Sequence, residues 1–233
     1  MSPLPTSAGV WVVVPAYNEA RLIGTVLREL LAAYASVLVV DDGSRDDTAA
    51  LASAAGATVL RHALNRGQGA AITTGMRYAL DSGAQFVVTF DADGQHTVAD
   101  IVALLAPLRE GRADVTMGSR FLEGAATRRT MPAGRAAMLH AAVWFTRLTT
   151  GLRVTDAHNG LRAFSRKAAE TIRWHADGMA HASEIPREIR RHRLRFEEVP
   201  VRITYSAYSL GKGQRGLDAV RVLVEYLFGF VAR

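Results

Sequence analysis

Hydrophobic residues along the chain follow two alternating patterns. Short runs rich in β-branched residues predict strands over residues 10–15, 36–41, 57–61, 85–90 and 114–119. Between these runs, apolar residues at helical spacing predict helices over residues 19–33, 46–55, 68–82 and 98–109. Continuously apolar strands are typical of a sheet that is buried on both faces. The alternation therefore predicts an α/β fold with a mostly parallel central sheet flanked by helices.

The pattern changes after residue 120. A polar loop containing Gly and Pro covers residues 122–134, and a long helical pattern follows over 135–150. The remaining predicted elements are a strand at 160–164, a helix at 182–192, a strand at 197–205 and an apolar helical pattern at 216–233. We expect amphipathic helices in this second part of the chain.

Charge is distributed unevenly between the two parts. Residues 1–110 hold 7 Lys and Arg against 11 Asp and Glu, whereas residues 111–233 hold 21 against 11, a net charge of +10. Such a basic part indicates a phosphate-bearing or acidic partner, although a solvated basic surface has the same composition. The chain has no Cys, which excludes disulfides and thiolate metal sites. It shows neither a secretion signal nor a spanning apolar run, so we expect a soluble or membrane-surface protein.

Polar residues follow three of the predicted strands, as PAYNE at 15–19, DDGS at 41–44 and DADGQ at 91–95. In open α/β sheets, ligands bind beyond the carboxyl ends of the strands. Asp91, Asp93 and Gln95 are spaced by two, so an extended backbone would point all three side chains the same way.

Three oxygen-bearing side chains of this kind favour Mg²⁺ or Mn²⁺ as the bound metal. A calcium loop of the EF-hand type is excluded, because its twelfth position would be Val102 instead of Glu. An ordinary capped turn explains one of the two aspartates well and the pair less well.

Several motifs occur in an order and spacing that resemble family 2 glycosyltransferases. They are VVVPAYNEARLIGTVLREL, VLVVDDGSRDDT, LNRGQGAAITTGM, FDADGQH, MGSRF and NGLRAFSR. Within that family the chain is most similar to the dolichyl-phosphate mannose synthase and polyprenyl-phosphate glycosyltransferase branch, over residues 10–215. The resemblance implies a GT-A fold with a Rossmann-like sheet. We expect one domain over 1–233, in which 1–120 binds the nucleotide sugar and 121–233 faces the acceptor and a membrane.

The resemblance also implies roles for individual residues. The residues that would bind the nucleotide sugar are Pro15, Tyr17, Glu19, Val40, Asp42, Asp91, Ala92, Asp93, Gln95, Arg120 and Lys212. The metal ligands would be Asp91, Asp93 and Gln95, holding Mg²⁺ or Mn²⁺. Catalysis is assigned to Asp91, Asp93 and Arg120. In this scheme Arg120 and Lys212 neutralise donor phosphates. To these catalytic residues we add Arg135, at the start of the predicted helix over 135–150, as a candidate for binding the acceptor phosphate.

The implied reaction is an inverting, metal-dependent transfer of a hexose from GDP-mannose or a UDP-hexose to a polyprenyl phosphate. An acceptor phosphate is already ionised near neutral pH, so the reaction requires no strong general base. Asp156, His158 and Glu184 are the candidate bases, and a structural role fits each of them better. One alternative is transfer to a saccharide, which needs a base. Another is a non-catalytic nucleotide-sugar-binding subunit, which the intact Asp91 and Asp93 pair argues against.

Some features depart from the family pattern or remain open. Gln68 and Ser206 replace basic residues of related sequences. The change at Gln68 argues against a cationic role there, and the change at Ser206 leaves UDP-sugars as open as GDP-mannose. The loop NRGQG at 65–69 suits either a phosphate cradle or a tight turn.

The surroundings of the site allow alternatives as well. The helix over 135–150 suits either a membrane surface or, through Trp144 and Phe145, the core. The basic run 187–195 is best explained as a solvated helix face and second as a contact with anionic lipid headgroups, in preference to a nucleic-acid site. We expect a cytoplasmic protein, peripheral on the inner face of the membrane, with a possible membrane-protein partner.

Overall fold

The computed structural model describes residues 7–122, 133–156 and 159–204. Its strands are β1 (Val10–Ala16), β2 (Ser36–Asp41), β3 (Thr58–Arg61), β4 (Phe86–Thr89), β5 (Val115–Ser119), β6 (Arg162–Ser165) and β7 (Phe196–Pro200). Its helices are α1 (Ile23–Ala33), α2 (Thr48–Ala54), α3 (Gln68–Asp81), α4 (Val98–Arg109), α6 (Ala133–Thr150), α7 (Arg166–Thr171) and α8 (His181–Arg191).

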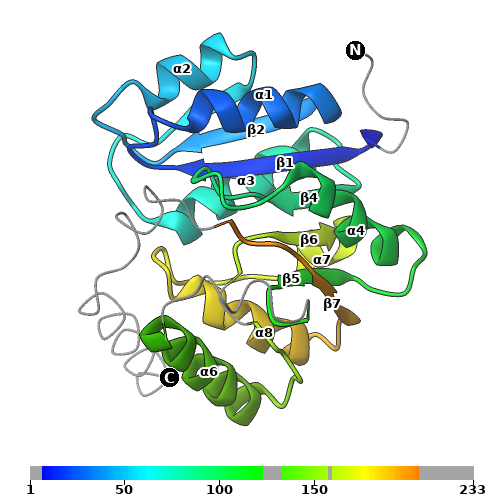
Figure 1. Cartoon of the computed structure of the whole chain (residues 1–233). Coiled ribbons are helices and arrows are strands. Elements are labelled where there is room, and N and C mark those ends of the chain that lie inside the picture. Colours follow the sequence, from blue (N-terminus) through cyan, green and yellow to red (C-terminus); the bar gives the residue numbers. More distant parts are fainter. Residues whose placement is uncertain (1–6, 123–132, 157–158, 205–233) are drawn as a thin grey trace.

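The strands of this part of the chain form one sheet with the order β3-β2-β1-β4-β6-β5-β7. Neighbouring strands run parallel except β6, which is antiparallel to both β4 and β5. Figure 1 shows the sheet crossing the molecule, with α1 and α2 at one end and α6 and α8 at the other. The predicted α/β fold with a mostly parallel sheet is confirmed.

Both faces of the sheet are covered, which explains why its strands are continuously apolar. On β1, Val12 and Val14 pack in the cluster formed with α1 and α4. Val13, on the opposite face, packs with residues of α3, α7 and α8. Because successive side chains of a strand point to opposite faces, each face receives its own set of β-branched residues.

The parallel topology brings the carboxyl ends of β1, β2 and β4 to one edge of the sheet. The loops that follow these strands contain the polar motifs singled out in the sequence. The largest differences from the expected boundaries are at two places: the first helix begins at Ile23 rather than at residue 19, and β7 ends at Pro200 rather than at 205. The short helix α7 was missed, although Ser165 marks its start by accepting a hydrogen bond from the Ala168 N–H (3.2 Å).

The apolar pattern at 216–233 lies outside the described residues. Among the helices that the structure does describe, none combines the length and the apolar character needed to cross a bilayer.

Candidate active site

Side chains of the loop after β2 hold the loop after β1 in place. The Asn18 N–H donates to Ser44 Oγ (2.9 Å), and the Glu19 N–H donates to Thr48 Oγ1 (2.8 Å). In return, the Arg45 N–H donates to Asn18 Oδ1 (2.9 Å). Asn18 adopts a left-handed conformation with φ 52, which asparagine tolerates better than most residues. These bonds explain why residues 17–22 form a loop instead of the first turn of a helix.

Asp42 anchors a second loop, which follows β3. Its carboxylate lies 2.7 Å from His62 Nδ1 and accepts hydrogen bonds from the backbone N–H groups of Arg66 (3.0 Å) and Gly67 (2.6 Å). The far side of the His62 ring contacts Thr74 Oγ1 at 2.9 Å. The backbone donors of this loop are therefore directed at a carboxylate of the protein, which supports the tight-turn alternative over a phosphate cradle.

Gly67 is required where this loop meets the segment before α8. Its φ is +108, and a Cβ at this position would lie 2.5 Å from the carbonyl oxygen of Asp177. The same carbonyl accepts a hydrogen bond from the Ala70 N–H at the start of α3 (3.0 Å). The glycine thus permits a close backbone approach that any side chain would prevent.

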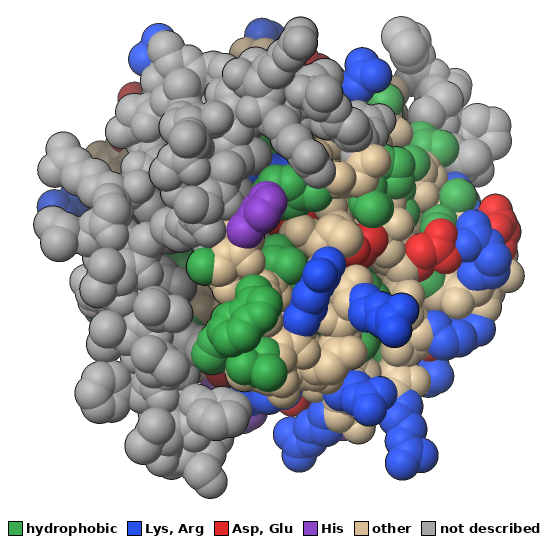
Figure 2. Space-filling model, turned by 60° about the horizontal axis from the view of Figure 1, so that its bottom comes forward, with side chains coloured by type: hydrophobic (Ala, Val, Ile, Leu, Met, Phe, Trp, Pro, Cys, Tyr) green, Lys and Arg blue, Asp and Glu red, His purple; other side chains and the backbone are tan. Residues whose placement is uncertain are grey.

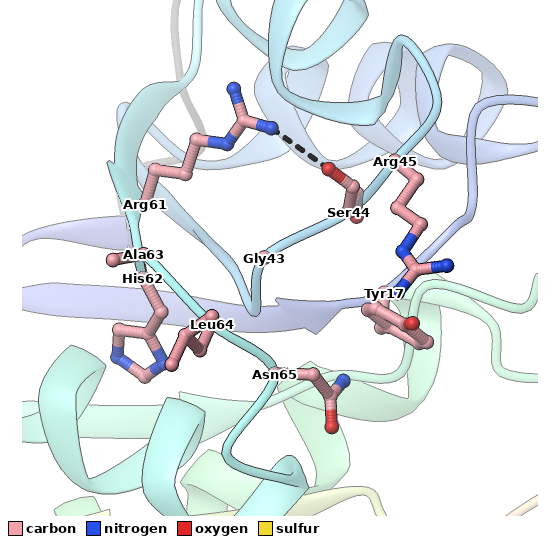
Figure 3. A pocket seen from close by; sticks show the side chains of 9 residues that line it. All are labelled: Tyr17, Gly43, Ser44, Arg45, Arg61, His62, Ala63, Leu64 and Asn65. Atoms are coloured by element: carbon pink, nitrogen blue, oxygen red, sulfur yellow. Dashed lines mark hydrogen bonds between the residues drawn. The ribbon is translucent and has the colours of Figure 1, made fainter.

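A hollow of about 510 Å³ opens beside these loops (Figure 3). Its lining is Tyr17, Gly43, Ser44, Arg45, Arg61, His62, Ala63, Leu64 and Asn65. Arg61 connects β3 to the loop after β2 on one side of the hollow. Its Nε lies 3.0 Å from Asp41 Oδ2, and its Nη2 donates to the Ser44 carbonyl (2.8 Å). Exposed Tyr17 and Leu64 supply apolar surface and the loops supply polar groups, a combination typical of small-ligand sites.

Asp91 lies after β4 and is held from two sides. Gln68 Nε2, at the start of α3, donates to Asp91 Oδ1 (2.9 Å), and His96 Nε2 lies 3.4 Å from Oδ2. The carboxylate packs so closely on Gly160 that a Cβ there would lie 2.0 Å from Oδ2. Asp91 is therefore fixed by three separate parts of the chain.

The backbone after Asp91 turns instead of staying extended. Residues 92 and 93 form a turn, and Gly94 has a φ of 70. Asp93 Oδ1 accepts a hydrogen bond from the Gln95 N–H (3.0 Å). The argument that an extended backbone aligns the three side chains is therefore wrong, because its spacing rule applies only within a strand. The assignment of Gln95 as a metal ligand stays a prediction.

The electrostatic surroundings shift the pKa values of the two aspartates in opposite directions. Burial disfavours the charged form of Asp91, but the hydrogen bond and charge of His96, with the charges of Arg162 and His181, outweigh it and lower its pKa. Burial and then the negative charge of Asp91 raise the pKa of Asp93 to about 6.

Arg162 lies on β6 with 2% of its surface exposed. Burial lowers its pKa to about 10, against the opposing effect of Asp91 and Asp156.

The donor set at Asp91 and Asp93 fits a hard divalent cation. The negative charges of the two carboxylates repel each other, and this repulsion contributes to the raised pKa of Asp93, so a cation bound between them would be stabilising. Among the described residues, no group of three or more His, Asp and Glu side chains is arranged to hold a metal ion. A cation bound by this pair would therefore complete its shell with amide, water or ligand oxygens, which is how Mg²⁺ is usually bound in proteins.

Two of the candidate bases form ion pairs or hydrogen bonds within the protein. Asp156 is fully buried and pairs with Arg120, whose Nε lies 2.6 Å from Asp156 Oδ2. Glu184 accepts hydrogen bonds from the backbone N–H groups of His175 (2.6 Å) and Ala176 (3.3 Å). The third candidate, His158, lies outside the described residues.

Comparison with known proteins assigns the chain to a family. The model of the family described as glycosyl transferase family 2 matches residues 11–173. This chain belongs to glycosyl transferase family 2. The match runs from the second residue of β1 past the end of β6 and contains both aspartates, so the site described above lies inside the family's shared region.

This family 2 glycosyltransferase has relatives that match almost end to end. It is 32% identical to the polyprenol monophosphomannose synthase of Mycolicibacterium smegmatis, over 90% of this chain and 82% of the relative. It is 29% identical to a UDP-N-acetylglucosamine–dolichyl-phosphate N-acetylglucosaminyltransferase of Methanococcus voltae, over 94% of each chain. These names support the expected polyprenyl-phosphate branch.

A solved structure shows the same fold. Glucosyl-3-phosphoglycerate synthase from Mycobacterium tuberculosis, in complex with Mn²⁺, uridine diphosphate and glucosyl-3-phosphoglycerate, superposes with a TM-score of 0.69 at 21% identity. The comparison covers 96% of this chain and 78% of that one. The expected GT-A fold is confirmed, and the chain is a glycosyltransferase.

The structure separates the predicted site residues of the glycosyltransferase into groups. Tyr17 lines the hollow, whereas the side chains of Pro15, Val40 and Ala92 are buried and are not part of its lining. Val40 is 0% exposed and packs in the cluster that includes α3, so its side chain has no surface for a nucleoside to contact. Sequence reasoning placed Val40 correctly along the strand but could not assign it to a face.

Two predicted phosphate-binding residues are less fully described. The backbone of Arg135 lies in the first turn of α6, but its side chain is outside the described part. Lys212 lies outside the described residues altogether.

Sequence reasoning missed the contributions of Arg162 and His62. Arg162 is a cation within the otherwise apolar segment LRAF, and that isolated charge in a predicted strand was the available signal. His62 had no such signal, because its partners Asp42 and Thr74 are distant in sequence.

Proposed function

We propose that this glycosyltransferase transfers a hexose from a nucleoside diphosphate sugar to a polyprenyl phosphate, using Mg²⁺ or Mn²⁺. The observation that carries the proposal is the fixed Asp91 and Asp93 pair at the same sheet edge as the hollow at Tyr17. The polyprenyl and dolichyl phosphates named for the relatives support the acceptor. The Mn²⁺ and uridine diphosphate named for the structural neighbour support the cofactor and the donor class.

In this proposal the hollow binds the nucleoside of the donor, and the aspartates bind the cation at its diphosphate. Tyr17 and the loop that Asp42 fixes would enclose the nucleoside, with Glu19 nearby on the loop after β1. Asp91, Asp93 and Gln95 would hold the cation, which stabilises the negative charge that develops on the leaving diphosphate. Arg120 and Lys212 would add positive charge, although Arg120 shares its guanidinium with Asp156. The donor class includes both UDP-hexoses and GDP-mannose.

The chemistry of the acceptor suits the side chains that are present. An ionised phosphate attacks the sugar carbon without losing a proton, so the enzyme must orient it rather than activate it. Asp156 and Glu184 are engaged in structural bonds, which favours a phosphate over a saccharide acceptor. Direct displacement by the acceptor predicts inversion at the sugar carbon. Arg135 is our candidate for binding the acceptor phosphate.

This proposal treats 1–233 as one catalytic domain, with 1–120 binding the donor and 121–233 facing the acceptor. Because a polyprenyl phosphate is anchored in a bilayer, the enzyme would work at a membrane surface, on its inner face where nucleotide sugars are made. A membrane protein partner is compatible with this location.

A donor screen by thermal shift tests the proposal. GDP, UDP and their sugars are compared with Mn²⁺, with Mg²⁺ and with a chelator, on the native chain and on Asp93→Asn. Asp81→Asn, at the exposed end of α3, is the matched control. We expect one nucleotide to give a metal-dependent shift that Asp93→Asn abolishes and Asp81→Asn keeps. Transfer of labelled sugar should fall on the order of 10²-fold or more in Asp93→Asn.

Thermal shift and transfer of labelled sugar together separate the alternatives. Label that moves into a lipid-extractable product supports a polyprenyl phosphate acceptor, and label in a water-soluble saccharide supports polysaccharide synthesis. Tight donor binding without any transfer would identify a non-catalytic subunit. No shift with any nucleotide, in a folded chain, would remove the proposal.

A further inference from the structure

Gln68, the first residue of α3, makes a direct contact with the candidate metal site. Its Nε2 donates to Asp91 Oδ1 (2.9 Å), which lies 23 residues away in the sequence. A carboxylate oxygen that accepts one hydrogen bond keeps a second lone pair for a metal ion. The contact therefore orients Asp91 and leaves the same oxygen able to bind a cation.

Two glycines fix the backbone on either side of Gln68. A Cβ at Gly67 would lie 2.5 Å, and one at Gly69 2.2 Å, from a backbone carbonyl oxygen of residues 176–177. Both glycines therefore pack directly on the segment before α8, an approach that a side chain would prevent. The Gly69 carbonyl also accepts a hydrogen bond from Trp174 Nε1 (3.1 Å). The side chain of Gln68 thus extends from a backbone position that is closely defined.

The charges around the two aspartates are unequal. Burial disfavours the charged form of Asp91, but basic side chains around it outweigh burial and lower its pKa. These side chains are His96, which also contributes a hydrogen bond, Arg162 and His181. Burial and then the charge of Asp91 raise the pKa of Asp93 to about 6. Asp91 is therefore ionised without further help, whereas the pair as a whole would be stabilised by a cation that both carboxylates share.

Position 68 adds no charge to these surroundings. The chain has a net charge of +6, and Figure 2 shows Lys and Arg side chains spread over one face of the molecule. The side chain that donates to Asp91 from α3 is nevertheless a neutral amide. An ammonium at this place would repel a metal ion bound by the same carboxylate. The amide therefore supplies a hydrogen bond without electrostatic competition with the metal.

We propose that Gln68 is a positioning residue of the cation site: its neutral amide orients Asp91 and leaves the charge of the two aspartates to Mg²⁺ or Mn²⁺. Side chains that hydrogen-bond to a metal ligand set its orientation, and their loss typically costs about 10–100-fold in metal affinity. The inference rests on the proposed function for the presence of the cation. A purely structural role for Gln68 makes a different prediction, because any hydrogen-bond donor of similar length would then serve.

Mn²⁺ titration of the full chain, followed by the electron paramagnetic resonance of free Mn²⁺, tests the inference. The titration is run without nucleotide, with UDP and with GDP. Gln68→Leu removes the donor, whereas Gln68→Lys keeps a donor and adds a charge. Thr73→Lys, at an exposed position later in α3, is the matched control for the added charge. Urea unfolding with a chelator measures the stability of each variant without metal.

The two Gln68 variants should lose Mn²⁺ affinity for different reasons. Gln68→Leu should bind Mn²⁺ about 10–100-fold more weakly than the native chain, because Asp91 loses its orienting contact. Gln68→Lys should bind Mn²⁺ more weakly by about tenfold or more, because the ammonium competes with the cation for Asp91. Without metal, Gln68→Lys should be at least as stable as the native chain, since the ammonium pairs with that carboxylate. Thr73→Lys should change the affinity by less than about twofold, because its charge is screened by solvent.

Opposite changes of stability and Mn²⁺ affinity in Gln68→Lys are the result that a purely structural role would not give. Native Mn²⁺ affinity in either Gln68 variant would overturn the inference. Equal losses of stability and affinity in both variants would assign Gln68 a structural role and overturn it as well.

Transfer assays separate this inference from the proposed function. If the Gln68 variants lose Mn²⁺ affinity as expected but the native chain transfers no sugar to a polyprenyl phosphate, the inference stands and the proposed function fails. If the native chain transfers sugar and both Gln68 variants bind Mn²⁺ as it does, the proposed function stands and the inference fails. A native chain that binds no Mn²⁺ under any of the three conditions would overturn both the inference and the proposed use of a metal.

Discussion

Asp93 is the residue whose ionisation the fold opposes most clearly. Its pKa rises from 3.8 to about 6, because of burial and then the charge of Asp91. Below pH 3.8 both folded and unfolded chains hold the proton, and above about 6 both have lost it. Between these values the folded chain holds more protons, so stability falls as the pH rises through this window.

This linkage predicts the behaviour of Asp93→Asn in the presence of a chelator. The amide cannot ionise, so the variant should be more stable than the native chain at pH 7, by about 1–2 kcal/mol after allowing for solvent screening. The difference should vanish near pH 4. Urea unfolding at several pH values measures it. A difference that does not change between pH 4 and pH 7 would contradict the assigned origin of the penalty.

Arg162 supplies buried positive charge close to Asp91 and Asp156. In the sheet it pairs with Thr89 of β4 and with Met117 of β5, so it sits between the strands that lead to Asp91 and to Arg120. Its charge helps to lower the pKa of Asp91. We therefore regard it as a positioning residue beneath the candidate active site.

Removing this charge should be costly. Arg162→Met leaves the carboxylates of Asp91 and Asp156 less compensated, and we expect a loss of about 3 kcal/mol or more in the free energy of unfolding. Arg162→Lys, which keeps the charge, should lose less. Arg77→Met on the exposed side of α3 is the control and should change stability by less than about 0.5 kcal/mol. Equal losses in the Met and Lys variants would show that packing, not charge, is responsible.

At the scale of elements, an ion pair joins the starts of β5 and β7. Arg195 donates through Nε (3.0 Å) and Nη2 (2.9 Å) to Asp114, whose carboxylate also accepts the Arg195 N–H (2.9 Å). The hydrogen bond from Arg195 is the main reason that the pKa of Asp114 falls from 3.8 to about 2. This contact fixes the edge strand whose neighbour, β5, leads to Arg120.

A depressed carboxyl pKa contributes stability that is present above pH 3.8 and is lost as the pH falls toward 2. Asp114→Asn should therefore cost about 1–2 kcal/mol at pH 7, allowing for the exposure of Arg195. The gap between variant and native chain should narrow as the pH drops below about 4. Denaturant unfolding at pH 7 and pH 3 checks this. A gap of constant size would show that the hydrogen bonds matter and the charge does not.

At the scale of the whole molecule, the charge is divided along the chain. The net charge is +6, and the acidic residues 1–110 are outweighed by a basic second part. The loops that we propose to bind the donor belong to the first part, and α6 and α8 belong to the second. This division suits an enzyme that meets a metal–nucleotide complex on one side and an anionic surface on the other.

Binding to anionic vesicles should accordingly weaken with salt. Raising NaCl from about 0.05 M to 0.5 M shortens the screening length several-fold and should reduce binding of the native chain strongly. Cosedimentation with vesicles of phosphatidylcholine and phosphatidylglycerol across the salt series measures this effect. Binding that is independent of salt would show that the basic second part of the chain plays no part.

The sequence by itself determined the fold class and the identity of the family. Strands that are apolar on both faces are buried only in a sheet covered on both sides. The alternation of these strands with helices predicts that the sheet is mostly parallel. Because the carboxyl ends of parallel strands meet at one edge, the polar residues after β1, β2 and β4 were correctly expected to gather there. Local order in the chain was enough for these conclusions.

Only the tertiary structure decided how individual side chains are used. Asp42 binds a loop 24 and 25 residues away, and Asp156 meets Arg120 across 36 residues. Asp91 is held by Gln68 and by Gly160, which lie on opposite sides of it in the sequence. Trp144 is exposed and Thr146 is buried, whereas the sequence left open whether Trp144 belongs to the surface or to the core. Contacts of this range depend on how the strands are ordered in the sheet, and strand order is set by the packing of the whole chain rather than by any local pattern.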